Sequence, residues 1–226
     1  MALCDLSGKR ILLTQANAFM GPSLQSMLQA CGAEVIADNR DFLDPRAPGQ
    51  LIKEAGEIDA LLLNLGIPAP STPASEVEDD EWGLLFRHMV DPLPRFARAL
   101  LPGMIERQRG KILLMGSASA LRGMKRASSY SAARGAQLAW VQAVGAEMAN
   151  KGIQVNAIAQ NFVDNPTYFP ADIQANPAFQ ARLQREVPLG RLVSAEEDAS
   201  FAAYLCSDAA NCFVGQIFPV CGGWSH

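Results

Sequence analysis

Residues 10–37 read RILLTQANAFMGPSLQSMLQACGAEVIA, and they contain one complete strand–helix–strand unit. Arg10–Thr14 and Glu34–Ala37 are short apolar runs of the kind found in strands that are covered on both faces. Between them, Pro22–Cys31 has the length and composition of a helix, and Gly32 follows it where a left-handed C-terminal cap is favoured. Two strands joined by a helix predict a parallel pair with a right-handed crossover.

The rest of the chain continues this alternation. Further strands are expected at Asp59–Leu63, Lys111–Met115, Gln154–Ile158 and Gln216–Val220, and further helices at Asp79–Arg107, Ser131–Asn150 and Ala195–Ser207. No repeat and no long linker rich in Pro, Gly or Ser divides the sequence. The pattern predicts an α/β fold: a Rossmann-like, doubly wound parallel sheet with helices on both faces, three layers in all, formed by residues 1–226 as a single domain.

The amino-acid composition and net charge indicate which classes of binding partner to expect. The chain has 226 residues, of which 49% are hydrophobic, so it can bury a large core without disulfides. Its 19 Lys and Arg against 23 Asp and Glu give a formal net charge of −4. Because the sequence has no basic stripe, nucleic acid and an anionic membrane surface are poor partners, and a small molecule is favoured.

Cysteine usage and the first residues bear on the compartment. The five cysteines, Cys4, Cys31, Cys206, Cys212 and Cys221, are odd in number and include no Cys-x-x-Cys pair, so neither a disulfide framework nor a zinc site is expected. They are interpreted as small apolar core residues in a reducing compartment. Asp5 stands where a signal peptide would need an apolar segment, and no apolar run approaches about 18 residues. These patterns predict a soluble, cytoplasmic protein.

The turn after the first strand, residues 14–21, reads TQANAFMG. Ligands of open parallel sheets bind beyond the carboxyl ends of the strands, and a dinucleotide needs glycines in this turn so that the backbone can approach the pyrophosphate. Gly21 is present, but Gln15 and Phe19 stand at the other two glycine places. We therefore expect the Phe19 side chain to block a cofactor site. Asp38, at the end of the second strand, could hold a ribose hydroxyl, which keeps cofactor binding open as an alternative.

Three polar residues at fixed spacing form the second pattern with chemical meaning. Tyr130 and Arg134 are four residues apart at the start of a predicted helix, so their side chains share one face. A phenol with a pKa of about 10 is a poor base at neutral pH, but a charged guanidinium nearby favours the phenolate. Ser117, at the carboxyl end of its strand, could hold a substrate oxygen while the proton leaves. An isolated Tyr/Arg pair is more often a surface contact. Here the position of the residues at the carboxyl edge of the sheet favours the catalytic interpretation.

These residues carry a resemblance to a known family. The whole chain resembles the short-chain dehydrogenase/reductase superfamily in its turn 14–21, its Ser117 and Tyr130, its Asn64-Leu65-Gly66 and its Gly222-Gly223. Within it, the chain is similar to the halohydrin dehalogenases, or haloalcohol dehalogenases. Their Thr-x4-Phe/Tyr-x-Gly turn is matched by Thr14, Phe19 and Gly21, and their Ser-x12-Tyr-x3-Arg pattern is matched by Ser117, Tyr130 and Arg134. The resemblance implies an enzyme without a nicotinamide cofactor, because Arg replaces the Lys that holds the nicotinamide ribose in reductases.

The resemblance further implies a halide site in the loop after the fifth strand. The halide-binding residues would be Gln160, Asn161, Phe162 and Val163 of this loop, with Phe19 packing from across the cleft. Successive backbone N–H groups in a turn and the positive edges of aromatic rings both suit an anion. Gln160 stands where relatives often carry proline. Tyr168 and Phe169 are expected to line the substrate pocket, although without the resemblance these aromatics would be interpreted as ordinary core packing.

The implied function is cofactor-independent dehalogenation of vicinal haloalcohols. Ser117 and Tyr130 would bind the hydroxyl, and Tyr130 would accept its proton with the help of Arg134. The oxygen would then displace halide from the neighbouring carbon and give an epoxide. In reverse, halide, azide, cyanide or nitrite would open the epoxide ring. Two alternatives stay open: a divergent NAD(P)-dependent short-chain oxidoreductase, which Asp38 and the fold permit, and a ligand-sensing relative without chemistry, which the complete catalytic set disfavours.

Small residues on the helix that carries Tyr130 predict assembly. Ala132, Gly135, Ala139 and Ala143 recur at helical spacing, and such a stripe allows close approach of another helix. We predict a homo-oligomer, and the resemblance implies a homotetramer. The alternative is that the stripe packs inside the monomer.

Overall fold

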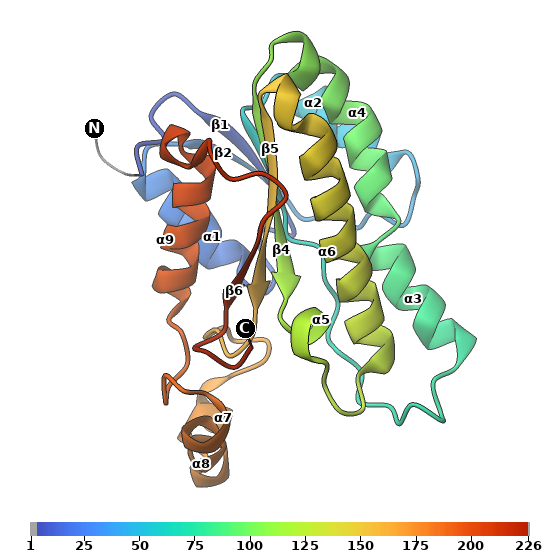
Figure 1. The fold of residues 1–226 in the computed structure, drawn as a ribbon, viewed down its shortest axis with the longest axis vertical. Coiled ribbons are helices and arrows are strands. Elements are labelled where there is room, and N and C mark those ends of the chain that lie inside the picture. Colours follow the sequence, from blue (N-terminus) through green and yellow to red (C-terminus); the bar gives the residue numbers. More distant parts are fainter. Residues whose placement is uncertain (1–3, 226) are drawn as a thin grey trace.

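The computed structural model describes residues 4–225, which contain one central sheet of six parallel strands in the order β2-β1-β3-β4-β5-β6 (Figure 1). The strands are β1 (Arg10–Thr14), β2 (Glu34–Asp38), β3 (Ala60–Leu63), β4 (Gly110–Ser117), β5 (Ile153–Gln160) and β6 (Ile217–Val220). Each predicted strand is confirmed, because the observed ends differ from the expected ones by no more than two residues.

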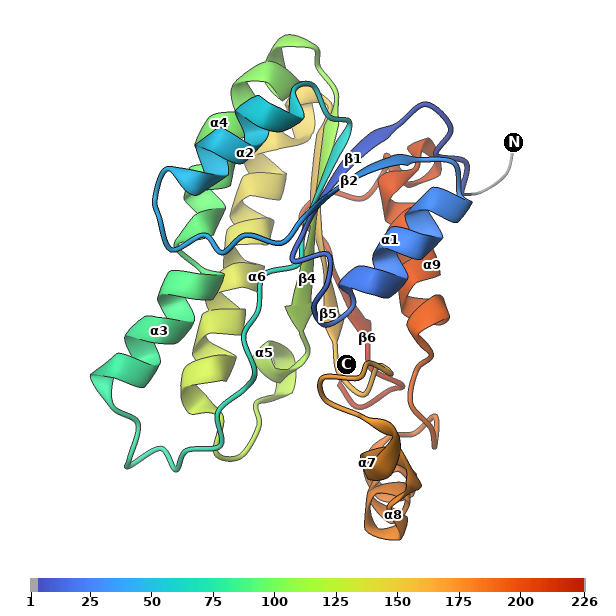
Figure 2. The same ribbon diagram turned by 180° about the vertical axis from the view of Figure 1, so that it is seen from behind.

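Helices cover both faces of the sheet and form the outer two of three layers (Figures 1 and 2). On one face α1 (Gly21–Ala30) packs against α9 (Ala195–Cys206), and on the other lie α2 (Ala47–Ala55), α4 (Pro92–Glu106) and α6 (Ser128–Met148), with α3 (Asp79–Met89) against α6. The remaining helices are α5 (Ser119–Arg122), α7 (Ala171–Ala175) and α8 (Pro177–Glu186), with the 3-10 turns η1 (Ala149–Lys151) and η2 (Asp208–Ala210). The predicted doubly wound α/β fold is confirmed.

The apolar core is divided by the sheet into two layers. Side chains alternate along each strand, so Leu12 of β1 belongs to the layer under α2, α4 and α6, whereas Ile11 and Leu13 belong to the layer under α1 and α9. The residues of β3 and β4 follow the same rule. Continuous runs of Leu, Ile and Val form these strands because both of their faces are buried.

The two longest strands set the position of the carboxyl edge. β4 and β5 pair over eight residues, from Gly110 with Ile153 to Ser117 with Gln160. Their last residues therefore lie side by side, and Figure 1 shows both arrowheads pointing toward α5, α7 and α8. A serine and a glutamine from segments far apart in the sequence meet at this edge.

The single helix expected over Asp79–Arg107 is wrong, because the chain forms α3 and α4 with a break between Met89 and Pro92. Proline has no N–H for the helical ladder and crowds the preceding turn, but it fits the first position of a new helix. The N–H of Asp91 instead donates to the carbonyl of Phe86. Helices α2, α7 and α8 were not among the expected segments, although Asn176 caps α8 by accepting from the N–H of Ala178 at 2.9 Å.

The interpretation of all cysteines as core residues is only partly correct. Cys206 and Cys221 are buried, whereas Cys4 and Cys31 are half-buried and Cys212 is exposed. No helix among residues 4–225 is both long and apolar enough to cross a membrane. Residues 1–3, which belong to the segment inspected for a signal peptide, lie outside the described part of the chain, and cytoplasmic localisation stays a prediction.

Candidate active site

A cavity of about 270 Å³ lies at the carboxyl edge of the sheet. Its lining includes every residue that the sequence assigned to the site: Phe19, Ser117, Tyr130, Arg134, Gln160, Asn161, Phe162, Val163, Tyr168 and Phe169. These side chains come from the turn after β1, the end of β4, the start of α6 and the loop after β5. The fold therefore brings together four segments that are separate in the sequence.

Tyr130 and Arg134 form the polar centre of this cavity. They are one turn apart on α6, and Nε of Arg134 donates a hydrogen bond of 3.0 Å to the Tyr130 hydroxyl oxygen. The guanidinium carbon lies 5.1 Å from the centroid of the phenol ring. Both side chains are buried, so the guanidinium charge acts on the phenol with little screening by solvent.

Backbone oxygens and one amide, rather than a carboxylate, accept the hydrogen bonds of Arg134 Nη1. Its Nη1 donates to the carbonyl oxygens of Leu65 and Met115 at 3.0 and 3.1 Å and to Oε1 of Gln137 at 2.9 Å. Within residues 4–225 no carboxylate forms an ion pair with this guanidinium. Its positive charge is therefore not neutralised by a side chain and remains directed at the cavity.

Gln137 is a supporting residue that the sequence reasoning missed. Its side chain is fully buried, and Nε2 donates to the carbonyl of Met89 at 2.7 Å and to that of Leu65 at 3.3 Å. These bonds fix Oε1 toward Arg134. The three-residue spacing from Arg134 on one helix was a usable signal, because it places both side chains on the same face.

The pKa of Tyr130 lies below its usual range. Burial is the largest single influence and raises the pKa of this phenol, but the charge and hydrogen bond of Arg134, together with hydrogen bonds from Tyr168 and Ser117, lower it by more. Tyr168 shows the opposite behaviour: burial and then the neighbouring Tyr130 raise its pKa. Of these two phenols, Tyr130 is therefore the one that gives up its proton more readily.

Ser117 is held in place by its neighbour Ser119. The Ser117 hydroxyl donates to the Ser119 oxygen at 2.9 Å and accepts from the Ser119 backbone N–H at 3.2 Å. Ser119 opens α5 and is buried, so these bonds fix the hydroxyl at the edge of the cavity. Ser119 was not singled out in the sequence.

The turn after β1 has left-handed backbone at two places where a glycine-rich turn would carry glycine. Gln15 and Phe19 have φ angles of 46° and 52°, a left-handed conformation that costs a side-chain-bearing residue roughly 1–2 kcal/mol. Gly21 is required, because a Cβ there would lie 2.4 Å from the carbonyl oxygen of Gln15. The Gln15 amide offsets the strain by pairing with the backbone N–H and C=O of Gly66 at 3.0 and 3.1 Å. Asn64 donates to two carbonyls of the same turn.

Aromatic rings surround the mouth of the cavity. Phe19 stacks on Tyr168 with centroids 5.8 Å apart, and Phe162 stacks on Phe169 at 6.0 Å. The Arg182 guanidinium lies 5.2 Å from the Phe162 centroid. The positive edges of these rings and the Arg182 cation give the cavity lining a surface that suits an anion.

The loop after β5 differs from the expected row of free backbone N–H groups. The N–H of Asn161 donates to the carbonyl of Val220, and the N–H of Phe162 donates to the Asn161 side-chain oxygen at 2.9 Å. Phe162 also has a φ angle of 51°, and Asn165 ties the loop by donating to the carbonyl of Val163 at 3.0 Å. Two of the N–H groups assigned to an anion are thus already used within the protein.

Gln160 makes a contact that the sequence did not suggest. Its Nε2 donates to Oδ2 of Asp198 on α9 at 2.6 Å. Asp198 is completely buried, and burial raises the pKa of its carboxyl to about 7, with the Gln160 hydrogen bond opposing part of the increase. Asp198 shares the first turn of α9 with Glu196 and Glu197, and it was not singled out in the sequence.

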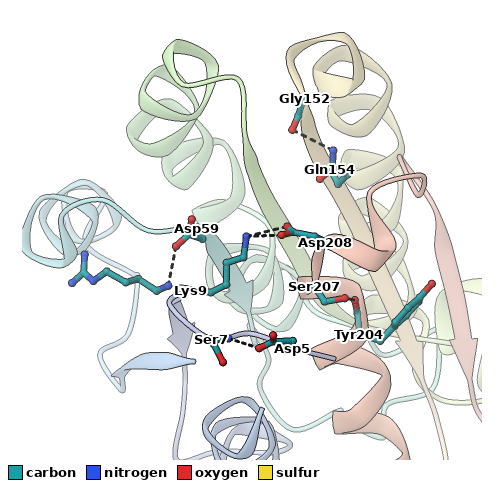
Figure 3. Close-up of polar contacts among 10 residues, drawn as sticks. Asp5, Ser7, Lys9, Asp59, Gly152, Gln154, Tyr204, Ser207 and Asp208 are labelled. Atoms are coloured by element: carbon teal, nitrogen blue, oxygen red, sulfur yellow. Dashed lines mark hydrogen bonds and ion pairs between the residues drawn. The ribbon is translucent and has the colours of Figure 1, made fainter. Parts of the chain in front are cut away.

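A second cavity, of about 290 Å³, lies at the opposite edge of the sheet (Figure 3). There Lys9 forms an ion pair with Asp208 at 2.9 Å, and Asp59 accepts from the backbone N–H of Arg10 at 2.9 Å. Lys111, near the start of β4, also lines this cavity, and its Nζ is buried without a hydrogen-bond partner in the described chain. Burial lowers the pKa of Lys111.

A family model described as enoyl-(acyl carrier protein) reductase matches residues 3–225, nearly the full length of the protein. The chain belongs to the short-chain dehydrogenase/reductase family. Its relatives in this family include a 3-oxoacyl-(acyl-carrier-protein) reductase from Salmonella typhimurium, which is 29% identical over 245 residues covering 97% of this chain and 98% of the relative.

Solved structures similar to this chain include proteins whose names describe a different chemistry. One described as a dehalogenation enzyme superposes with a TM-score of 0.90 at 30% identity, over 97% of this chain and 99% of the other. A halohydrin dehalogenase bound to ethyl (2S)-oxiran-2-ylacetate has a TM-score of 0.88 at 24% identity, over 96% and 97% of the two chains. At that identity the second likeness shows the fold alone.

The family implies a nicotinamide dinucleotide, but the residues of this chain do not fit one. Phe19, at a glycine place of the phosphate-binding turn, projects a ring into the cavity lining and stacks on Tyr168, and Arg134 stands where family reductases use Lys. Both carboxylate oxygens of Asp38 already accept hydrogen bonds from Arg40, at 3.0 and 2.7 Å. A cavity of about 270 Å³ lies below the roughly 300–1,000 Å³ of pockets for drug-sized ligands. A small substrate fits this site better than a dinucleotide.

Proposed function

We propose that this protein is a cofactor-independent halohydrin dehalogenase that converts vicinal haloalcohols into epoxide, halide and a proton. The observation that carries the proposal is the pairing of a filled dinucleotide turn with an activated phenol. Phe19 occupies the place of the cofactor, while Arg134 contacts Tyr130 directly at 3.0 Å in the same cavity. A catalytic base is thus retained where a hydride carrier has no room.

Tyr130 acts as the base and Ser117 as its partner in binding the substrate hydroxyl. Arg134 stabilises the phenolate, so Tyr130 can accept the hydroxyl proton at a pH below the usual range of a phenol. The alkoxide electron pair forms the C–O bond of the epoxide as the neighbouring C–X bond breaks and halide leaves with its electron pair. In reverse, Tyr130 donates its proton to the epoxide oxygen while halide, azide, cyanide or nitrite attacks carbon.

The rate advantage would come from alignment and electrostatics. Bonds from Ser119 and Gln137 fix Ser117 and Arg134, so the hydroxyl is bound in one orientation with little reorganisation. Opposite it, the leaving halide would lie among Phe19, Gln160, Asn161, Phe162 and Val163, with Tyr168 and Phe169 lining the substrate pocket. The likeness to a dehalogenation enzyme at 30% identity supports this assignment.

A divergent NAD(P)-dependent oxidoreductase is the second candidate. The family match and the 29% identity to a 3-oxoacyl-(acyl-carrier-protein) reductase favour it. Against it stand the filled turn at Phe19 and the replacement of the family Lys by Arg134.

One pair of assays separates the two functions. The purified chain is incubated with 1,3-dichloro-2-propanol without nicotinamide, and chloride and epoxide are measured. We expect one chloride and one epoxide per haloalcohol consumed. NADH is titrated in parallel and followed by fluorescence, with no binding expected. Absence of chloride release together with tight NADH binding would falsify the proposal.

We also propose that the small-residue stripe of α6 is an interface between copies of this chain, in a homotetramer. Ala139 and Ala143 are exposed, and a Cβ placed on Gly135 would meet no atom within 4 Å. The stripe is thus not covered inside the monomer. Light scattering should give four times the mass of one chain, and a monomer contradicts the proposal.

A further inference from the structure

Gln160 connects the cavity to a buried acid in the layer between the sheet and α9. It is the last residue of β5, it lines the cavity, and its Nε2 lies 2.6 Å from Oδ2 of Asp198. Oδ1 of Asp198 is buried and has no hydrogen-bond partner among residues 4–225. An acid that is removed from solvent thus contacts the site through a single glutamine amide.

No charged group balances Asp198 from the elements around it. α1 and β5 contain no ionisable side chain, and the only one on β4, Lys111, lies at the opposite end of that strand. Asp208 of η2 follows the far end of α9 and is paired with Lys9.

Ionisable groups nearer in the sequence are also engaged elsewhere. On α9 itself Glu196 is exposed, and Glu197 pairs with Arg191 at 2.8 Å. Asp164, in the loop after β5, accepts from Gln174 at 2.8 Å. Among residues 4–225, the Gln160 amide is therefore the only hydrogen-bonding partner of a carboxylate at Asp198. Because this single bond offsets only part of the effect of burial, the pKa of Asp198 is raised to about 7. Both protonation forms are accessible near neutral pH.

The carboxylate and the neutral acid of Asp198 bind different ends of the Gln160 amide. A carboxylate can only accept, so it binds the N–H of Gln160, which is the arrangement in the structure. A neutral acid carries an O–H donor, which suits the amide oxygen after the amide group turns over. In each case the end of the amide that Asp198 does not hold is the end available to the cavity.

We propose that Asp198 is a positioning residue for the anion subsite and acts through Gln160. As the neutral acid it donates to Oε1 of Gln160 and leaves the amide N–H groups for the anion, and as the carboxylate it holds Nε2 and turns Oε1 toward the cavity. This inference rests on the proposed function, because it supplies a donor for the leaving halide. Such a donor would compensate for two of the three backbone N–H groups expected in the anion turn, because those of Asn161 and Phe162 are bonded within the protein.

The consequence is an anion affinity that falls as pH rises through neutrality. A bound halide is a hydrogen-bond acceptor, so it gains from Nε2 and is repelled by Oε1. Halide would therefore bind more tightly on the acid side, where epoxide opening needs it, and leave more easily on the alkaline side.

Bromide binding at two pH values tests this inference. Calorimetric titrations are made at about pH 6 and about pH 8.5, with Tyr130→Phe in every protein so that ionisation of the phenol does not contribute. We expect the Kd for bromide to rise about tenfold with pH, in line with loss of one hydrogen bond to a charged partner. In the added Asp198→Asn variant the Kd should be the same at both pH values. The control Glu196→Gln, an exposed acid on the same helix, should retain the full response.

A second variant tests the same inference if Asp198→Asn does not fold. Gln160→Met leaves Asp198 in place but removes the amide, so bromide should bind weakly and without pH dependence. An undiminished pH response in either variant overturns the role of Asp198 while leaving the dehalogenase proposal intact. Absence of bromide binding at both pH values overturns the inference, and the chloride-release assay then shows separately whether the proposed function stands.

Discussion

The two cavities at opposite ends of β4 have similar volumes, about 270 and 290 Å³, and each contains a buried basic residue. At the carboxyl end, Arg134 donates to Tyr130, to two carbonyls and to an amide. At the amino end, Nζ of Lys111 has no such partner in the part of the chain that the structure describes. The difference lies in what each cation can do when water is removed.

A guanidinium stays charged when buried, whereas an ammonium can lose its proton. The pKa of Lys111 is accordingly lowered by burial. Arg134 keeps its charge, and backbone dipoles stabilise it without neutralising it, so the charge can shift the pKa of Tyr130. The carboxyl edge thus combines a permanent cation with a titratable group, and the amino edge combines a titratable cation with ion pairs such as Lys9 with Asp208.

The largest expected effect comes from removing the proton acceptor at the carboxyl edge. Tyr130→Phe should reduce chloride release from 1,3-dichloro-2-propanol by about 10³-fold, within the range for a general base. The matched control is Lys111→Met, which removes a buried polar side chain from the other cavity and should leave turnover unchanged. Equal losses in the two variants would show that the cavities are not functionally distinct.

The next effect concerns the pH dependence of the free energy of unfolding. Asp198 near the carboxyl edge and Lys111 at the amino edge should contribute slopes of opposite sign. Burial raises the folded-state pKa of Asp198 from 3.8 to about 7. Between these pH values the folded state holds the proton more tightly than the unfolded state, so the free energy of unfolding falls as pH rises. Between about pH 5 and pH 8, wild type should lose about 3 kcal/mol relative to Asp198→Asn, at roughly 1.4 kcal/mol per pKa unit.

Lys111 should behave in the opposite way. Because burial lowers its folded-state pKa, its contribution increases as pH rises toward the ordinary value of 10.5. The free energy of unfolding of wild type should therefore increase relative to that of Lys111→Met as pH rises. Urea unfolding of the three proteins at several pH values measures both slopes, and slopes of the same sign would contradict the assignment.

A smaller effect is expected when the permanent cation is exchanged for a titratable one. Arg134→Lys cannot reproduce the bonds of Nε and Nη1 together, so kcat/KM for dehalogenation should fall about a hundredfold at neutral pH. The rate depends on the Tyr130 phenolate and rises with pH, so the midpoint of the pH profile should move up toward the ordinary phenol value of about 10.

The control for this exchange is Arg109→Lys at the amino edge, an exposed residue paired with Glu57 at 3.2 Å. Its kcat/KM and pH midpoint should match those of wild type. An unchanged midpoint in Arg134→Lys would mean that Arg134 does not set the pKa of Tyr130.

Sequence reasoning predicted the parts of the molecule that depend on order along the chain. The alternating apolar runs predicted the parallel sheet, because both faces of each strand are buried. Gln15 and Phe19 were placed at glycine positions, and the structure gives both of them left-handed φ angles. The spacing of Tyr130 and Arg134 predicted their contact, because four residues on a helix make one turn.

The helix break at Pro92 could have been predicted from the same kind of signal, since proline lacks the N–H that would continue the preceding helix and fits the first turn of a new one. The engaged N–H groups of Asn161 and Phe162 could not, because their acceptors depend on the path of the loop and on the neighbouring strand. The sequence placed these residues at the cavity but did not predict their hydrogen-bond partners.

By itself, the sequence determined the layered fold, the filled turn at Phe19 and the Ser117, Tyr130 and Arg134 set, because each of these follows from neighbours within a few residues or from strand order. Only the tertiary structure decided that Asp198, 38 residues from Gln160, is a buried acid bonded to this lining residue of the cavity, and that Nζ of Lys111 is buried without a hydrogen-bond partner among residues 4–225. The physical reason is that burial and pairing of a charge are set when the sheet and helix layers close on each other, and the local sequence around an acidic residue of a helix is the same whether it faces water or the sheet.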